Sequence, residues 1–194
     1  MTWIESISRE TATGHLESLY QTYQRPNRTI ANIYRAHSLR PHTLEGHTAL
    51  YRAVLGHADN ELPLWYLETV GLYVSVLNQC SYCIYHHAHA GGLAYPGESE
   101  AWATITDALL NDRTADVFKG KELALLEYVR NLTLDPLSLT ATSINVLRAA
   151  GANNGEVLEV NQVASYFAYA NRVVLGLGVT LDGEVQAERT EILF

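Results

Sequence analysis

The 194-residue sequence predicts an all-α fold, and three observations support this. Apolar residues recur every three or four positions along most of the chain, which is the spacing of amphipathic helices. Few stretches alternate between apolar and polar residues, as half-buried strands do. The 5 prolines fall between the periodic segments, where helices are expected to stop. We therefore expect a bundle of helices.

Local signals predict where individual helices end. The first helix should end near Arg25-Pro26, a short second helix should stop before Pro41, and Thr43 can cap the third. Gly91-Gly92 indicates a fraying helix end, and Gly151 lies just past another helix, where a left-handed glycine is common. The expected helices cover about residues 8–24, 30–38, 43–57, 64–77, 81–93, 98–111, 116–132, 141–150 and 155–177.

A similar spacing of residues recurs in two parts of the chain, which indicates a weak internal repeat. Glu68 precedes Cys80 by twelve residues, and Glu159 precedes Asn171 by the same count. A duplicated helical unit whose second copy lacks the thiols would explain this spacing. The alternative is that any two buried helices look alike, and both interpretations stay open at this point.

The length fits one domain, because domains usually contain roughly 100–200 residues. We expect a single domain over residues 1–194, with no element assigned to the tail 181–194. Packing on a neighbouring subunit is one role for that tail. The abundance of apolar residues in 64–77 and 157–177 is compatible with a homo-oligomer.

Charge and composition exclude several functions. The net charge of −8 argues against non-specific binding of nucleic acid and against docking on anionic membranes, because both need a basic surface. No apolar run reaches the ~18 residues of a membrane-spanning helix. The N-terminus has neither the basic region nor the apolar core of a secretory signal, so we expect a cytoplasmic protein.

The whole thiol content of the chain lies in one Cys-x-x-Cys motif. Its 2 cysteines are Cys80 and Cys83, and His87 follows four residues later. In a reducing cytosol such a pair is more often catalytic or metal-binding than a structural disulfide. Vicinal thiols can close to a disulfide and reopen, so the motif favours sulfur redox chemistry without a bound cofactor.

Helical geometry brings these groups onto one face. Cys80, Cys83 and His87 fall within an arc of roughly 60° on an α-helix. Asn78 and Ser81 are residues typical of helix starts, and a helix N-terminus stabilises a thiolate. His87 can then accept the thiol proton and later return it.

Glu68 is the candidate partner of this face, but its position depends on the chain path. On one straight helix it would lie roughly 18 Å from Cys80. It can approach the thiols only if the chain turns between the two segments, and Asn78-Gln79 is a plausible break. A carboxylate there would orient His87 or relay a proton.

Two other interpretations of the motif remain. Free cysteine is among the most buried residue types, so Cys80 and Cys83 can be simple core residues. A zinc site would use both thiols, His87 and a fourth ligand. The candidates for that fourth ligand are Glu68, His86 and His89. The chain lacks a second Cys-x-x-Cys or a His-x-His cluster, which weakens the zinc interpretation, so no metal is expected.

The pattern Glu68-x11-Cys80-x2-Cys83-x3-His87 resembles the active-site signature of alkylhydroperoxidase D-like proteins. These proteins belong to the all-helical carboxymuconolactone decarboxylase superfamily. The likeness covers about residues 38–180 and is strongest to the peroxidase-related branch of that superfamily. Further segments that carry it are Val74-Ser75-Val76-Leu77-Asn78, Leu147-Arg148-Ala149-Ala150-Gly151 and Asn171-Arg172-Val173.

The resemblance implies a peroxidase and a role for each residue. Cys83 would attack a hydroperoxide and become a sulfenic acid, and Cys80 would resolve it to a disulfide. An external dithiol or lipoyl-type donor would re-reduce the pair. Glu68 and His87 would form the proton relay. Tyr82 stands where characterised members carry histidine, and its hydroxyl can donate a hydrogen bond to a peroxide oxygen.

Two further functions fit the same residues. A lactone decarboxylase-like enzyme would transfer protons with Glu68 and His87 and need no thiols. A redox-sensing oligomer would use the disulfide to switch its assembly without catalysis. Substitution of both cysteines distinguishes the first from a peroxidase, and sizing of the reduced and oxidised protein tests the second.

Overall fold

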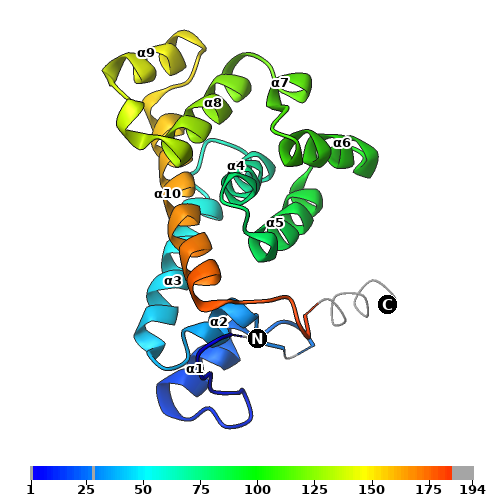
Figure 1. Cartoon of the computed structure of the whole chain (residues 1–194), viewed down its shortest axis with the longest axis vertical. Helices are drawn as coiled ribbons and strands as arrows, with labels where there is room; N and C mark the ends of the chain where they lie inside the picture. The colour runs from blue at the N-terminus through cyan, green and yellow to red at the C-terminus, as the bar shows by residue number, and fades with distance from the viewer. Residues whose placement is uncertain (1, 28, 185–194) are drawn as a thin grey trace. The chain divides into compact units, whose positions relative to one another are not determined.

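The computed structural model describes residues 2–27 and 29–184, and within these ranges it contains α-helices, one 3-10 helix and no strand. The predicted all-α class is therefore confirmed. Figure 1 shows the elements in chain order. They are α1 (Gly14–Tyr23), α2 (Asn32–Ala36), α3 (Pro41–Leu55), α4 (Leu64–Leu77), α5 (Ser81–Ala94), α6 (Ser99–Leu110), α7 (Thr114–Val117), α8 (Gly120–Leu134), η1 (Pro136–Ser138), α9 (Ala141–Ala149) and α10 (Asn154–Leu177).

The chain forms two compact units. Unit 1 comprises Met1–Leu50 and Arg172–Phe194, and unit 2 comprises Tyr51–Asn171. The division falls inside two long helices, α3 and α10, so each of these helices contributes to both units. The expectation of a single domain over residues 1–194 stays a prediction.

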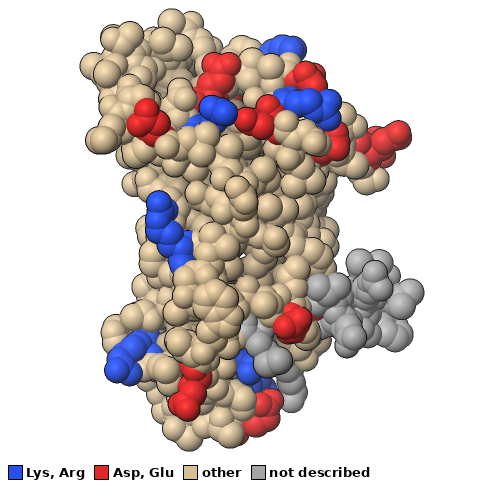
Figure 2. All heavy atoms as spheres, in the orientation of Figure 1, with Lys and Arg blue, Asp and Glu red and all other residues tan. Residues whose placement is uncertain are grey.

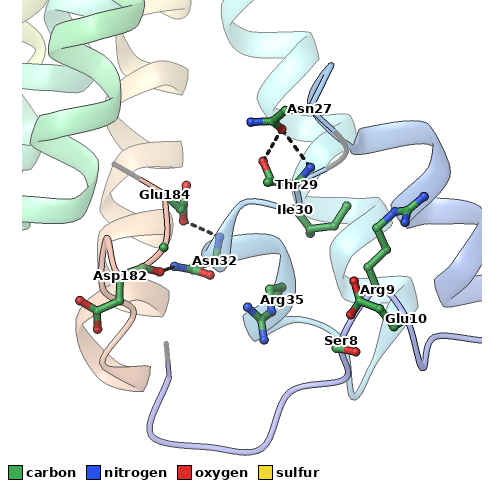
Figure 3. A pocket seen from close by; sticks show the side chains of 11 residues that line it. Ser8, Arg9, Glu10, Asn27, Thr29, Ile30, Asn32, Arg35, Asp182 and Glu184 are labelled. Atoms are coloured by element: carbon green, nitrogen blue, oxygen red, sulfur yellow. Dashed lines mark hydrogen bonds between the residues drawn. The ribbon is translucent and has the colours of Figure 1, made fainter. Parts of the chain in front are cut away.

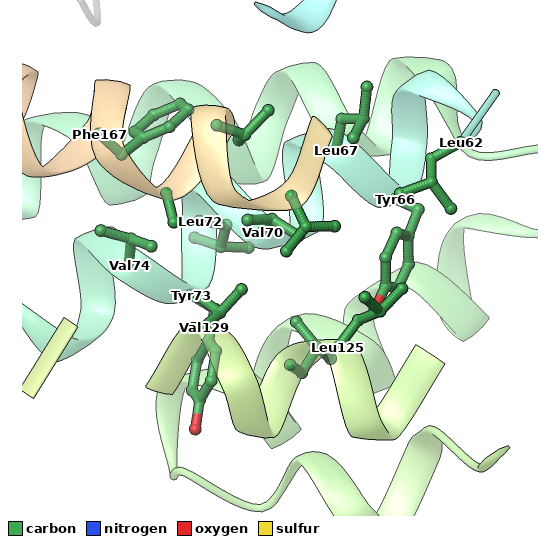
Figure 4. Packing of buried hydrophobic residues seen from close by; sticks show 14 of the residues in the cluster. Leu62, Tyr66, Leu67, Val70, Leu72, Tyr73, Val74, Leu125, Val129 and Phe167 are labelled. Carbon is green, nitrogen blue, oxygen red and sulfur yellow. The ribbon is translucent and has the colours of Figure 1, made fainter. Parts of the chain in front are cut away.

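Helix α4 is the centre of unit 2. Every residue from Tyr66 to Ser75 is buried, so this helix is apolar nearly all round, as expected for a helix enclosed on all sides. It packs against α5, α6 and α8. Figure 4 shows Val70, Leu72 and Val74 of α4 among side chains of the neighbouring helices. The helix that carries Glu68 is therefore held rigidly by its surroundings.

Glycines allow two close contacts between helices of unit 2. A Cβ atom at Gly71 of α4 would overlap the ring of Phe167 from α10. At Gly91 of α5 it would overlap the indole of Trp102 from α6. Helix α5 ends at Ala94, one residue beyond the expected end, and Gly91 and Gly92 in its last turn make room for Trp102.

Unit 1 has a small core of its own. Leu16, Leu19 and Tyr20 of α1 pack with Ile30 and Leu44. The structure corrects two expected helix starts in this unit. Helix α1 begins at Gly14 and not near residue 8, and α3 begins at Pro41, so Thr43 lies within it. Proline fits the first helical position because it lacks the N–H that would be unsatisfied there.

The charged side chains are sparse on the face shown in Figure 2. Lys and Arg are scattered there, and they alternate with Asp and Glu instead of forming a continuous basic surface. Within the described ranges no helix combines the length and the apolar character needed to cross a membrane.

Candidate functional site

The two helices of the site are joined by a tight turn with a left-handed residue. Gln79 has φ 57°, its N–H donates to the carbonyl of Val76, and the N–H of Cys80 donates to the carbonyl of Ser75 at 2.9 Å. This pair of hydrogen bonds is a Schellman motif. It ends α4 and makes Cys80 the N-cap residue of α5. The chain therefore turns at Asn78-Gln79, as the sequence predicted.

The thiols are enclosed at this turn. Cys80 is 0% exposed and Cys83 is 3% exposed, and both are free cysteines. The pKa of Cys80 is lowered, because the side chain and backbone N–H of Cys83 stabilise its thiolate against the opposing effect of burial. The pKa of Cys83 is raised by its hydrogen bond to Cys80 and by burial, and a hydrogen bond from Asn171 partly offsets both. Because the two thiols share a hydrogen bond, ionisation of one opposes ionisation of the other.

Glu68 and His87 form a buried hydrogen bond. The distance from His87 Nδ1 to Glu68 Oε2 is 2.6 Å, and the side chains are 15% and 4% exposed. When Glu68 is ionised, Nδ1–H donates to the carboxylate, and Nε2 is left to accept a proton. Cys83 and His87 lie four positions apart on α5, which makes their side chains neighbours on the helix surface.

Aromatic rings line the imidazole. The centroid of the His87 ring lies 4.4 Å from that of Phe167 in an edge-to-face arrangement and 6.3 Å from that of Tyr51. Tyr51 in turn contacts Tyr166. These rings restrict water around the Glu68–His87 pair, which strengthens its electrostatic interaction.

A polar network from α4 and α10 reaches the thiols. Asn171 is 1% exposed, and its amide nitrogen donates to Ser75 Oγ at 3.1 Å. Its amide oxygen accepts a hydrogen bond from Asn78 Nδ2 at 2.9 Å. The sequence predicted no role for Asn171, whose signals were the twelve-residue spacing from Glu159 and its place in the segment Asn171-Arg172-Val173 that carries the family resemblance.

Glu68 and Glu159, the two acids of the repeated spacing, do not occupy equivalent places within unit 2. Glu159 accepts hydrogen bonds from the backbone N–H groups of Glu61 and Leu62, just before α4. Glu68, in contrast, contacts a side chain of the site. The idea of a duplicated helical unit stays a prediction.

The other candidates of the motif region lie around this centre. Tyr82 is buried, and its ring lies 4.5 Å from that of His86, so its contact with substrate stays a prediction. His89 is exposed. No group of three His, Cys, Asp or Glu side chains within residues 2–27 and 29–184 could hold a metal ion.

Unit 1 contains a separate polar cavity of about 410 Å³. Figure 3 shows Arg9, Arg35, Asn32 and Glu184 among its lining residues. The Glu184 carboxylate accepts a hydrogen bond from the Asn32 backbone N–H at 2.6 Å and pairs with Arg25 at 2.8 Å. Glu184 therefore links Arg25 and Asn32 within unit 1.

Sequence comparisons identify no relative. No protein-family model matches the chain, and no curated protein matches it.

Solved structures, however, share the fold. An uncharacterised peroxidase-related protein with an alkylhydroperoxidase AhpD core from Ralstonia eutropha JMP134 has a TM-score of 0.81 at 15% identity, over 94% of this chain and 93% of that one. The debrominase Bmp8 in complex with 2,3,4-tribromopyrrole has a TM-score of 0.74 at 15% identity, over 99% and 98%. A putative antioxidant defence protein AhpD from Agrobacterium tumefaciens has a TM-score of 0.60 at 20% identity, over 74% and 93%.

The class of the protein follows from these findings. It is an all-helical protein with the alkylhydroperoxidase D-like fold, and it carries a buried Cys-x-x-Cys pair at a helix N-terminus. The fold expected from the motif is confirmed.

Proposed function

We propose that the protein is a dithiol peroxidase that reduces organic hydroperoxides or hydrogen peroxide. The observation that supports this most directly is the Cys80–Cys83 pair at the start of α5, with an imidazole on the same helix that Glu68 orients. A thiolate and a base are the two groups that peroxide reduction by thiols requires. The shared fold with peroxidase-related proteins is consistent with the proposal.

The reaction needs two steps at the site. A thiolate attacks one oxygen of the hydroperoxide, the O–O bond breaks, and the alkoxide leaves as an alcohol after taking a proton that His87 supplies. The sulfur that made this attack is then a sulfenic acid. The second thiol attacks this sulfur, the S–O bond breaks, and water leaves as the disulfide forms. An external dithiol restores the pair by exchange, so two electrons and two protons reach the peroxide.

The attacking sulfur is Cys83 in this proposal, and Cys80 resolves the sulfenic acid. Because its pKa is lowered, Cys80 is the more acidic thiol and carries the negative charge when the pair loses its first proton. Transfer of the shared proton from Cys83 to Cys80 moves the charge to the attacking sulfur within an existing hydrogen bond. Trapping of the sulfenic acid with dimedone in each single variant tests this order, because only Cys80→Ser should accumulate the adduct.

Stopped-flow consumption of cumene hydroperoxide with a lipoyl or thioredoxin-like donor tests the proposed activity. Cys83→Ser should abolish turnover. An unchanged rate in that variant rules the peroxidase out. Full activity of the double serine variant towards a lactone substrate would indicate the thiol-independent decarboxylase chemistry instead. A null assay together with a change of oligomer on oxidation would indicate a redox sensor.

Reductive dehalogenation is a second candidate, because a debrominase shares the fold over nearly the whole chain. Here the thiolate would take the halogen from an electron-rich aromatic carbon, and the carbon would receive a proton. The second thiol would then displace halide and form the disulfide. Incubation with a brominated pyrrole and a dithiol, with bromide release as the readout, tests it.

A further inference from the structure

Asn171 lies at the meeting point of three helices of unit 2. It belongs to α10, its side chain hydrogen-bonds those of Ser75 and Asn78 at the end of α4, and its amide acts to lower the pKa of the Cys83 thiol on α5. Its side chain is almost completely enclosed, at 1% exposure. A buried amide with this many partners is fixed in one orientation.

The hydrogen-bond network determines that orientation. The Asn171 oxygen accepts from Asn78 Nδ2, so its nitrogen must face the other way. Ser75 Oγ donates to the carbonyl of Gly71 at 2.8 Å and therefore accepts from Asn171. One amide hydrogen of Asn171 is thus used by Ser75, and the second is the group that can lower the pKa of the Cys83 thiol.

We propose that Asn171 is a positioning residue that stabilises negative charge on Cys83 and so lets this sulfur, and not only Cys80, become the nucleophile. A hydrogen bond from an amide N–H favours a thiolate over a thiol. Burial opposes ionisation of Cys83. A fixed N–H donor that faces the sulfur can stabilise the thiolate in place of a cationic side chain. The catalytic role of Asn171 rests on the proposed peroxidase function, in which Cys83 is the attacking sulfur.

The same donor fits the second step of the reaction. When Cys83 carries the sulfenic acid, its sulfur or oxygen can accept the same N–H while Cys80 attacks. The backbone N–H of Cys80 is bound to the carbonyl of Ser75, and the side chain of Ser75 accepts from Asn171. Ser75 of α4 therefore holds both the backbone of Cys80 and the amide of Asn171.

The test uses variants that each retain one thiol. In a Cys80→Ser background Cys83 is the only cysteine of the chain, and its alkylation by iodoacetamide is followed from pH 5 to 11 by mass spectrometry. Asn171→Leu should raise the midpoint of that curve by about one unit and slow alkylation at pH 7 about tenfold, which corresponds to about 1.4 kcal/mol. In the Cys83→Ser background the same substitution should leave the curve of Cys80 unchanged.

A matched control lies on the same helix. Asn161 of α10 donates to the hydroxyl of Tyr128 at 2.7 Å and lies ten residues, roughly 15 Å, before Asn171 along the helix. Asn161→Leu should leave both alkylation curves unchanged. An unshifted Cys83 curve in Asn171→Leu, or equal shifts at both thiols, would overturn the proposal.

Two further measurements keep the test decisive. Far-UV circular dichroism shows whether Asn171→Leu folds. If it does not, Ser75→Ala provides the answer, because it removes the acceptor that orients Asn171 and should shift the Cys83 curve in the same direction by a smaller amount. No shift in Ser75→Ala would then reject the role of Asn171. Alkylation needs no peroxide, so this result is independent of whether the protein proves to be a peroxidase.

Discussion

The imidazole of His87 is useful as a base only in one tautomer, and Glu68 determines which. Its Oε2 lies 2.6 Å from Nδ1, and the carboxylate is almost fully buried. In the proposed reaction Glu68 would therefore act through His87 and not on the substrate. Glu68 and His87 would then act as one unit and not as two independent acid–base groups. The kinetics of single and double variants can distinguish these two arrangements.

Glu68→Gln and His87→Asn should show non-additive effects. We expect His87→Asn to lower kcat/KM for a hydroperoxide by a factor of about 10²–10⁴, the usual contribution of general acid–base catalysis. Glu68→Gln should lower it less, and the double variant should be no worse than His87→Asn alone. Glu127→Gln, an exposed carboxylate on α8, serves as the control. Effects that multiply in the double variant would show that Glu68 acts separately from His87.

Among the elements, the turn between α4 and α5 contains a strained backbone residue directly before Cys80 of the candidate site. Gln79 holds a left-handed backbone conformation at φ 57°, where glycine is favoured and most other residues are strained. The same kind of helix end is built by Gly151 at the end of α9. Strain of this kind is common beside functional groups, and here it directs Cys80 to the start of α5.

Gln79→Gly should therefore stabilise the protein by about 1 kcal/mol, because it removes the left-handed strain at a small cost in chain entropy. Urea unfolding followed by circular dichroism measures the change. Gly151→Gln is the reverse control and should destabilise by a similar amount, since Gly151 has φ 99°. A destabilised Gln79→Gly variant would mean that the side chain of Gln79 makes a contribution larger than the strain.

The packing of α4 against Phe167 leaves no room for a methyl group at Gly71. Gly71→Ala should destabilise the protein by about 1–3 kcal/mol, because the new methyl group overlaps the ring of Phe167. Displacement of Phe167 should also disturb His87, whose ring it contacts edge-on, so activity should fall as well. Gly46→Ala in α3 meets nothing within 4 Å and should be neutral or slightly stabilising. Thermal unfolding of both variants tests this, and equal effects would argue against the packing explanation.

The sequence predicted the helices of the site well, and the reasons are local. The apolar run of α4 is enclosed on all sides, and its bounds of Leu64–Leu77 agree with the expected ones. The shared face of Cys83 and His87 on α5 depends only on helical periodicity, whereas Cys80 is the N-cap residue just before the helix. Gly91-Gly92 correctly indicated a nearby helix end, but the sequence did not show that these glycines also leave the space that Trp102 fills.

Contacts between helices were beyond local reasoning. The approach of Glu68 to His87 depends on how α4 and α5 fold back on each other, and the sequence identified only the break at Asn78-Gln79. Asn171 is separated from Ser75 by 96 positions, so no local pattern links them. Long-range polar contacts of this kind are set by packing, which a periodicity cannot specify.

At the scale of the whole molecule, the two units depend on different interactions. Unit 2 contains the large core around α4, whereas unit 1 buries few apolar side chains and encloses polar ones. His37 and His47 lie together in unit 1, with ring centroids 5.0 Å apart. His37 Nδ1 contacts Thr43 Oγ1 at 2.9 Å, and the ring of Tyr34 lies against His47.

This pair should make the protein sensitive to acid. Burial, together with the charge of His37, lowers the pKa of His47 to about 3, and burial also lowers the pKa of His37. Both rings are therefore neutral in the folded protein, whereas in the unfolded chain they accept protons near pH 6.5. The stability they contribute is fully present above pH 6.5 and is lost as the pH falls towards 3.

His47→Gln should accordingly flatten the pH dependence of stability. For His47 alone, the expected loss between pH 8 and pH 5 is about 2 kcal/mol, because the unfolded state binds a proton that the folded state excludes. Urea unfolding at several pH values measures the slope, which is compared between variants because the substitution also changes stability at every pH. His42→Gln, at an exposed position of α3, should keep the wild-type slope. A wild-type slope in His47→Gln would show that the acid sensitivity arises elsewhere in the chain.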